Sequence, residues 1–192
     1  MSLVKAANHL KMIHKHRKLV RKGCFFLGLY WQGMTHDLSK YSWTEFRIGA
    51  KYYTDNKSPH NGERKEYGYS TAWLHHKGRN KHHMEYWIDF SYTGDHHITG
   101  VRMPEKYVAE MFVDRISASK LYLKDQYTTA SPLAYYNEKK KYHIIDDQTA
   151  ALLELLLVML KEQGEKPTLI YIREQVLKKG YQVLDYETDE KK

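Results

Sequence analysis

The chain has 192 residues, with 31 lysines and arginines against 23 aspartates and glutamates, for a net charge of +8. This length predicts one domain, or one domain with an appendage. A single cysteine, Cys24, excludes a disulfide framework and an all-cysteine zinc site. Long apolar runs and a secretory signal are absent from the sequence, so we expect a cytoplasmic protein with no membrane partner.

The first half of the chain reads as helices. Apolar residues at helical spacing predict a helix over 3–22 that Gly23 ends. Residues 24–37 are apolar nearly all round, which is typical of a buried helix. Ser42 and Glu45 have capping-box spacing and predict a helix to about residue 53. Residues 54–69 are rich in turn-forming residues and predict a loop.

The second half continues this pattern. A short helix capped by Ser70 carries the His75–His76 pair, and a further helical segment is expected over residues 82–90. Pro104 opens a helix to about residue 124. After a loop around Pro132, two more helices are expected, from Asp146 or Asp147 to about residue 163 and from Pro167 to about residue 179, with a frayed tail beyond Asp185. Strand alternation is not convincing anywhere, so the predicted class is all-α, with a core over 1–128 and a helical extension over 129–192.

Histidines and acids recur at positions that these helices would turn inward. The chain has 12 histidines. His9 and His16 share one helical face, and Asp114 is the acidic residue in an otherwise apolar strip. A lone buried carboxylate costs several kcal/mol unless a cation meets it. Imidazoles and carboxylates together suit zinc, iron, manganese or nickel, so the pattern points to a divalent metal site.

The ordered set His16, His36-Asp37 and Asp114 resembles the HD-domain superfamily of metal-dependent phosphohydrolases. The segment HDLSK, with Lys40 three residues after the doublet, is similar to the superfamily consensus. The stretch around His75–His76 resembles the extra histidine pair of two-metal members. The segments GYSTAWLHHKG, HHMEYW and MPEKYVAEMF together resemble a bacterial family of unknown function that is associated with this superfamily.

The resemblance implies a compact HD-like helical bundle and a metal ligand set. The ligands implied for a first ion are His16, His36, Asp37 and Asp114. A second ion would be bridged by Asp37 and held by one histidine from each tandem pair, which leaves His75 or His76 and His82 or His83 as candidates. The spacing between His16 and His36 is short for the superfamily, so His9 stays an alternative first ligand.

The implied activity is hydrolysis of a nucleotide or other small phosphate ester by metal-activated water. One or two ions of Mn, Fe, Zn, Co, Ni or Mg would serve. Asp37 and Lys40 are the implied catalytic residues, with Lys40 neutralising charge on phosphoryl oxygens.

Two alternatives to hydrolysis remain open. One is non-hydrolytic chemistry on the same fold, such as a di-iron oxygenase. The other is a nucleotide or nucleic-acid binding module, which the dispersed basic residues disfavour. A homodimer is a further open expectation.

Overall fold

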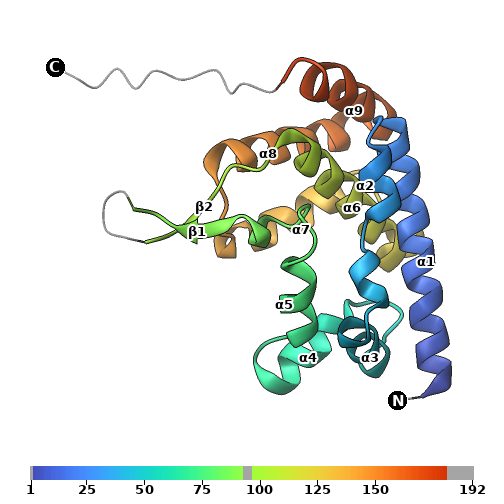
Figure 1. Ribbon diagram of the computed structural model, residues 1–192. Coiled ribbons are helices and arrows are strands. Elements are labelled where there is room, and N and C mark those ends of the chain that lie inside the picture. Colours follow the sequence, from blue (N-terminus) through green and yellow to red (C-terminus); the bar gives the residue numbers. More distant parts are fainter. Residues whose placement is uncertain (1, 93–96, 181–192) are drawn as a thin grey trace.

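The computed structural model describes residues 2–92 and 97–180 and consists almost entirely of helices (Figure 1). This confirms the predicted all-α class. The α-helices are α1 (Leu3–Phe26), α2 (Tyr30–Thr35), α3 (Trp43–Lys51), α4 (Pro59–Tyr67), α5 (Thr71–Lys77), α6 (Glu105–Leu123), α7 (Ser131–Lys139), α8 (Asp147–Gln163) and α9 (Glu165–Tyr171).

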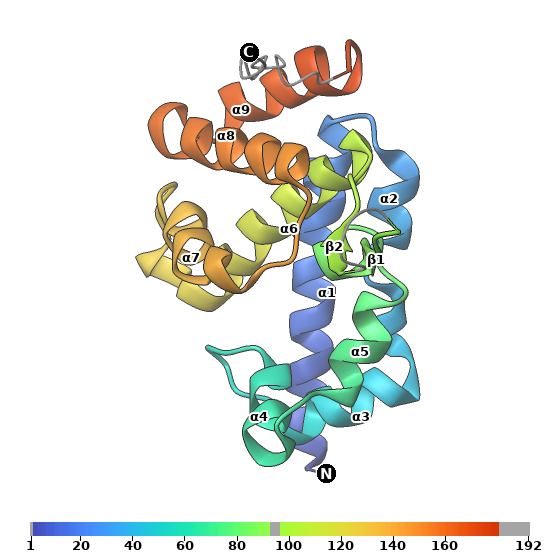
Figure 2. The ribbon, with the colours of Figure 1, turned by 90° about the vertical axis from the view of Figure 1, so that its left-hand side faces the viewer.

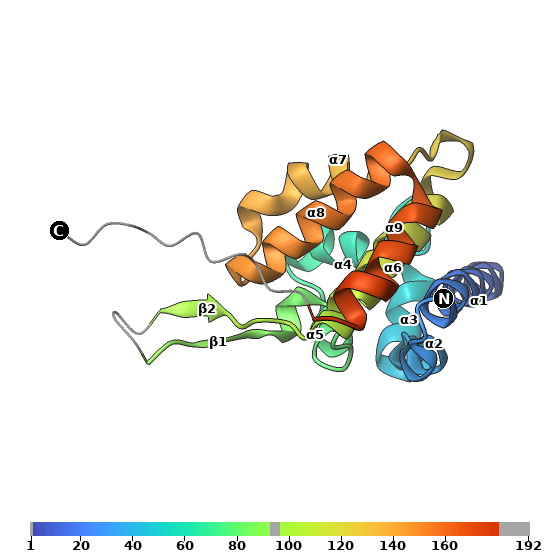
Figure 3. The same cartoon turned by 90° about the horizontal axis from the view of Figure 1, so that it is seen from above.

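Shorter elements connect these helices. An antiparallel hairpin of β1 (Ile88–Phe90) and β2 (Ile98–Gly100) projects from the helical body (Figure 3), with Ile88 opposite Gly100. The remaining elements are the 3-10 helices η1 (Leu38–Tyr41), η2 (Met84–Tyr86), η3 (Lys124–Gln126) and η4 (Lys140–Tyr142), and the π-helical turn η5 (Ile172–Leu177).

The long helix α1 packs against α6, and the other helices gather around this pair. Helices α3, α4 and α5 lie beside the N-terminal half of α1, whereas α8 and α9 lie at the opposite end (Figure 2). Gly23 permits the close approach of α1 to α6, because a Cβ atom there would lie 2.5 Å from Cγ1 of Val113. Gly23 therefore serves packing and does not end the helix, which continues to Phe26.

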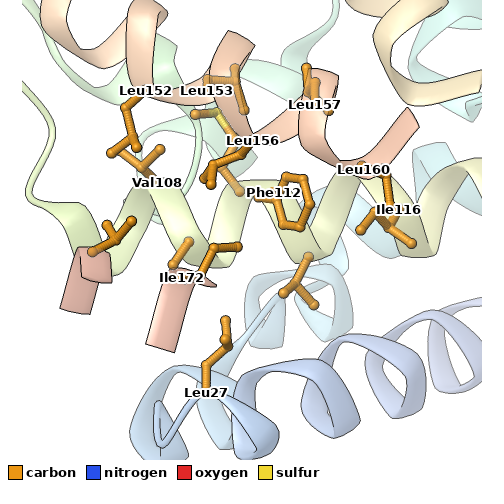
Figure 4. Close-up of a cluster of buried hydrophobic side chains, with 14 of the residues drawn as sticks. Leu27, Val108, Phe112, Ile116, Leu152, Leu153, Leu156, Leu157, Leu160 and Ile172 are labelled. Carbon is orange, nitrogen blue, oxygen red and sulfur yellow. The ribbon is translucent and has the colours of Figure 1, made fainter. Parts of the chain in front are cut away.

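The apolar core lies mainly between α6 and α8. Phe112 of α6 and Leu153, Leu156 and Leu157 of α8 are fully buried, and Figure 4 shows side chains of the two helices pointing toward each other. Burial of each such side chain contributes about 1.5–3 kcal/mol. These residues belong to one apolar cluster that also contains Leu27 and Ile172. The cluster therefore includes residues from both sides of the predicted boundary at residue 128.

The prediction of one buried helix over residues 24–37 is wrong. Gly28, with φ of +79°, separates α1 from α2. Much of the apolar surface of this segment faces outward, as Trp31 is 77% exposed and Tyr30 is 63% exposed. In this segment, apolar residues on every face of the predicted helix therefore correspond to an exposed aromatic surface and not to a buried helix.

Four further element predictions differ from the structure. Residues 54–69 contain α4 and the region around Pro132 contains α7, because Pro59 and Pro132 occupy the first turn of a helix, where proline is tolerated. Residues 82–90 form η2 and strand β1 in place of a helix. The last helix begins at Glu165, two residues before Pro167, and the predicted frayed tail lies outside the described residues.

Within the described ranges, the helices are too short or too polar to cross a membrane.

Candidate metal centre

The His36-Asp37 doublet sits in a tight turn between α2 and η1. Asp37 has φ of +55°, a left-handed conformation that aspartate tolerates better than most residues. Arg17 fixes this turn from α1: its guanidinium donates to the carbonyl oxygens of His36 (2.8 Å) and Met34 (2.9 Å) and to the hydroxyl of Tyr41 (3.1 Å). The turn points His36 and Asp37 into the space between α1, α5 and α6.

A first group of donor atoms comes from α1, this turn and α6. Nε2 of His16 lies 2.9 Å from Oδ1 of Asp114 and 3.4 Å from Oδ2 of Asp37. Nε2 of His36 lies 3.3 Å from the His16 nitrogen and 3.6 Å from Oδ1 of Asp114. Donor atoms that share one ion at zinc–nitrogen bond length lie about 3.0–3.4 Å apart. The spacing therefore matches a set of ligands around a common cation.

A second group faces the other oxygen of Asp37. Oδ1 of Asp37 lies 3.3 Å from Nε2 of His76 and 3.5 Å from Nε2 of His82. Nε2 of His83 lies 2.9 Å from the His76 nitrogen. The ligand atoms of these four residues lie within 4.8 Å of one another. Asp37 thus stands between two groups and offers one carboxylate oxygen to each.

Two buried glutamates contact the histidine ring nitrogens that point away from the donor groups. The sequence analysis did not assign either glutamate to the site. Oε1 of Glu110 lies 2.8 Å from Nδ1 of His36 and 3.1 Å from Nδ1 of His82. Oε2 of Glu45 lies 2.8 Å from Nδ1 of His76. Carboxylates that accept from the outer nitrogen of a ligating histidine fix its orientation and tautomer in metal proteins.

These contacts determine which nitrogen of each histidine ring carries a proton and which one faces the two groups of donor atoms. An ionised carboxylate only accepts, so Nδ1 of His36, His76 and His82 carries a proton, and Nε2 of each ring is the nitrogen that could bind a cation in place of a proton. Oδ1 of Asp37 and Nε2 of His82 are buried and have no hydrogen-bond partner. A cation between them would satisfy both atoms, and the buried His, Asp and Glu groups could hold a metal ion.

The charged groups of the site also favour a positive charge there. Burial opposes protonation of His36, but Asp37, Asp114 and Glu110 outweigh it and raise the pKa of His36 to about 10. Burial also opposes ionisation of Asp37, yet His36 and Lys40 hold its pKa well below the usual range. The carboxylates therefore stay ionised and attract positive charge to the site.

The site is closed on one side and reaches the surface on the other. The side chains of His36 and Asp37 are 0% and 1% exposed, whereas those of Asp114 and Lys40 are 16% and 26% exposed. Nζ of Lys40 lies 2.6 Å from Oδ2 of Asp37. An incoming molecule would therefore meet Lys40 and Asp114 first.

The geometry separates the alternatives that the sequence left open. His16 joins the first group, whereas His9 packs 5.6 Å from the ring of Phe46 and lies away from both groups. From the pair at 75 and 76, only His76 enters a group; His75 points to Oε1 of Glu45 at 2.7 Å. Both His82 and His83 reach the second group, where one of the two was expected.

These observations define a helical protein with paired histidine–carboxylate groups at the junction of α1, α5 and α6. Residues 5–159 match the family model described as a family of unknown function (DUF5662), and the chain belongs to this family. The matched range contains every donor residue of both groups. No curated protein and no solved structure matches the chain.

Proposed function

We propose that the protein is a metal-dependent phosphohydrolase of HD type, with one or two divalent ions bound at the two groups and a small phosphate ester as substrate. The observation that supports this most directly is the position of Asp37, whose two buried oxygens face separate sets of histidines. When bound, a divalent ion lowers the pKa of a coordinated water toward ~7 and polarises a phosphoryl oxygen.

The chain's own residues would divide the remaining work. His16, His36, Asp37 and Asp114 would hold one ion, and Asp37, His76, His82 and His83 the other. Glu110 and Glu45 keep the ring nitrogens aimed inward. Lys40 carries a positive charge at the open edge, where it would neutralise phosphoryl oxygens.

The test is metal analysis of the purified full chain followed by a phosphoester panel. We expect bound metal in the wild type, sharply less in Asp37→Asn, and unchanged content in Asp125→Asn, whose carboxylate is exposed on η3. Asparagine suits the left-handed backbone at position 37, so this change removes charge with little strain. After removal of the bound metal with a chelator, hydrolysis should require added Mn, Fe, Co or Mg, and it should be lost in Asp37→Asn.

Two results would contradict the proposal. One is a protein that takes up no metal and whose thermal stability does not respond to any of these ions. The other is bound iron with a visible absorption band and no hydrolysis of any ester, which would favour non-hydrolytic chemistry at the same residues.

A further inference from the structure

One side of α1 carries a row of basic side chains. The row follows the helical spacing i, i+3, i+4 and i+7, so its members project from one face: His14, Arg17, Lys18 and Arg21. The first acidic residue of the chain is Asp37, so α1 itself supplies no countercharge. Within residues 2–92 and 97–180, the two arginines and the lysine of this row form no ion pair. The positive charge of this face is therefore not balanced by carboxylates of the described chain.

The four side chains line a cavity of about 250 Å³ that opens to solvent. Gly33 of α2 and Tyr41 of η1 form its other walls. Helix α2 lies beside α1 (Figure 1), and Gly33 permits this approach because a Cβ atom there would lie 2.9 Å from Cδ1 of Phe25. Pockets for drug-sized ligands measure roughly 300–1,000 Å³, so this cavity suits a smaller and more compact molecule.

Arg17 and Tyr41 bring hydrogen-bond donors to the cavity. The guanidinium of Arg17 bonds to the carbonyl oxygens of His36 and Met34 and to the hydroxyl of Tyr41. These bonds use three of its five N–H groups, which leaves two among the contacts of the described residues. The Tyr41 oxygen accepts from Arg17, so its own O–H remains a donor. The lining of the cavity thus combines positive charge with unused donors and contains no carboxylate.

We propose that this cavity binds a compact anion with two or more linked phosphate groups, such as a diphosphate or triphosphate group. One phosphate group carries about −1.5 to −2 charges at neutral pH, so two are needed to balance Arg17, Lys18 and Arg21. Guanidinium groups suit phosphate because their planar fork bonds two oxygens at once. The site shares no residue with the two donor groups of the metal centre, so it can exist whether or not the protein hydrolyses phosphate esters.

Calorimetric titration of the metal-free full chain with inorganic pyrophosphate tests the site. The double variant Lys18→Gln/Arg21→Gln should bind at least about tenfold more weakly than the wild type, because it loses two charge-assisted contacts. The matched control is Lys15→Gln/Lys22→Gln, which removes two exposed cations of the same helix that do not line the cavity. We expect the control to lose less than about threefold. Equal losses in the two double variants would show a diffuse effect of net charge and would overturn the proposal.

Two further probes test the class of ligand. Inorganic phosphate should bind more weakly than pyrophosphate, because it offers one phosphate group to three cations. A single-stranded oligonucleotide should bind no more tightly than pyrophosphate, since a nucleic-acid backbone spreads its charges along a groove and does not concentrate them in one cavity. Equal affinities for phosphate and pyrophosphate would overturn the proposal. Tighter binding of the oligonucleotide would also overturn it and assign this face to nucleic acid.

Nuclear magnetic resonance can locate the bound pyrophosphate. The backbone amide signals of Lys18, Gly33 and Tyr41 should shift during the titration, because these residues line the cavity from three different elements. Shifts confined to Lys40 and His76 would place the anion at the metal centre and would overturn the proposal.

Thermal unfolding shows whether Lys18 and Arg21 serve binding or the fold. Without pyrophosphate, Lys18→Gln/Arg21→Gln should be at least as stable as the wild type, since Arg21 lies four residues from Arg17 and like charges at this spacing destabilise a helix. Pyrophosphate should raise the unfolding midpoint of the wild type and of Lys15→Gln/Lys22→Gln, and not that of Lys18→Gln/Arg21→Gln. A large loss of stability in Lys18→Gln/Arg21→Gln without pyrophosphate would show that these cations hold the fold together, which would overturn the proposal.

Discussion

Oε1 of Glu110 lies 2.8 Å from Nδ1 of His36, and both side chains are buried at the base of the first donor group. The same oxygen lies 3.1 Å from Nδ1 of His82 in the second group. One glutamate therefore orients a histidine of each group. A change at Glu110 should alter both groups at once.

Replacing Glu110 with glutamine should weaken metal binding by about 10–100-fold, the usual effect of losing a carboxylate behind a ligating histidine. The amide keeps the shape but loses the negative charge, so its oxygen accepts more weakly from the two N–H groups. The measurement is metal affinity by competition with a chelator. Glu105→Gln, on the first turn of the same helix and paired with Arg102 at the surface, is the control. Equal affinities for the two variants would contradict the role of Glu110.

The adjacent histidines of α5 should behave differently. His76→Ala should lose more than tenfold in metal affinity, since its Nε2 faces Asp37. His75→Ala should lose much less, because His75 contacts only the outer carboxylate Glu45. Both variants remove one imidazole from the same short helix, so each controls for the other. If His75→Ala lost metal as strongly as His76→Ala, the assignment of His76 to the second group would be wrong.

Arg17 should stabilise the turn that carries the doublet. Arg17→Lys keeps the charge but cannot reproduce three hydrogen bonds from one planar group, so we expect unfolding free energy to fall by about 1–3 kcal/mol and metal affinity to fall as well. Urea unfolding of the metal-free protein measures the first effect. Arg21 is exposed one turn further along α1, so Arg21→Lys should leave the unfolding free energy and the metal affinity unchanged. Identical behaviour of the two variants would refute the prediction.

His9 should make the protein less stable in mild acid. Burial, with a smaller effect of Lys40, lowers the pKa of His9 from 6.5 to about 4. The unfolded chain therefore binds this proton more tightly, so the contribution of His9 to stability is complete above pH 6.5 and is lost as the pH falls toward 4. The loss between pH 7 and pH 5 should be on the order of 2 kcal/mol.

A substitution can isolate this effect. In urea unfolding at the two pH values, His9→Leu should show a smaller decrease in unfolding free energy than the wild type. His14→Leu, exposed on the same helix, should follow the wild type. A decrease as large in His9→Leu as in the wild type would show that other groups carry the acid sensitivity.

Several features of the site could be predicted from the sequence because they depend on helical spacing alone. His16 and Asp114 project from long helices whose apolar faces fix their direction. Glu110 could have been found in the same way, since it precedes Asp114 by four residues and shares its face. Glu45 was interpreted only as a helix-capping residue, although it also contacts His75 and His76 from thirty residues away.

Other features depend on contacts that spacing does not reveal. Glu45 contacts both His75 and His76, and His76 alone of the two also reaches Asp37; α5 has too few residues for a periodic pattern to predict this. Pro59 and Pro132 predict loops from sequence alone, whereas each lies in the first turn of a helix.

The first donor group draws on α1, the turn after α2, and α6, which lie far apart along the chain. An ion bound there would act as a removable cross-link that ties the N-terminal helix to the centre of the molecule. Loss of that ion would then remove one tie between α1 and α6 and leave their apolar contact to hold the two helices together, so the protein would be cleaved more readily by proteases. Metal supply would in this way influence the lifetime of the protein.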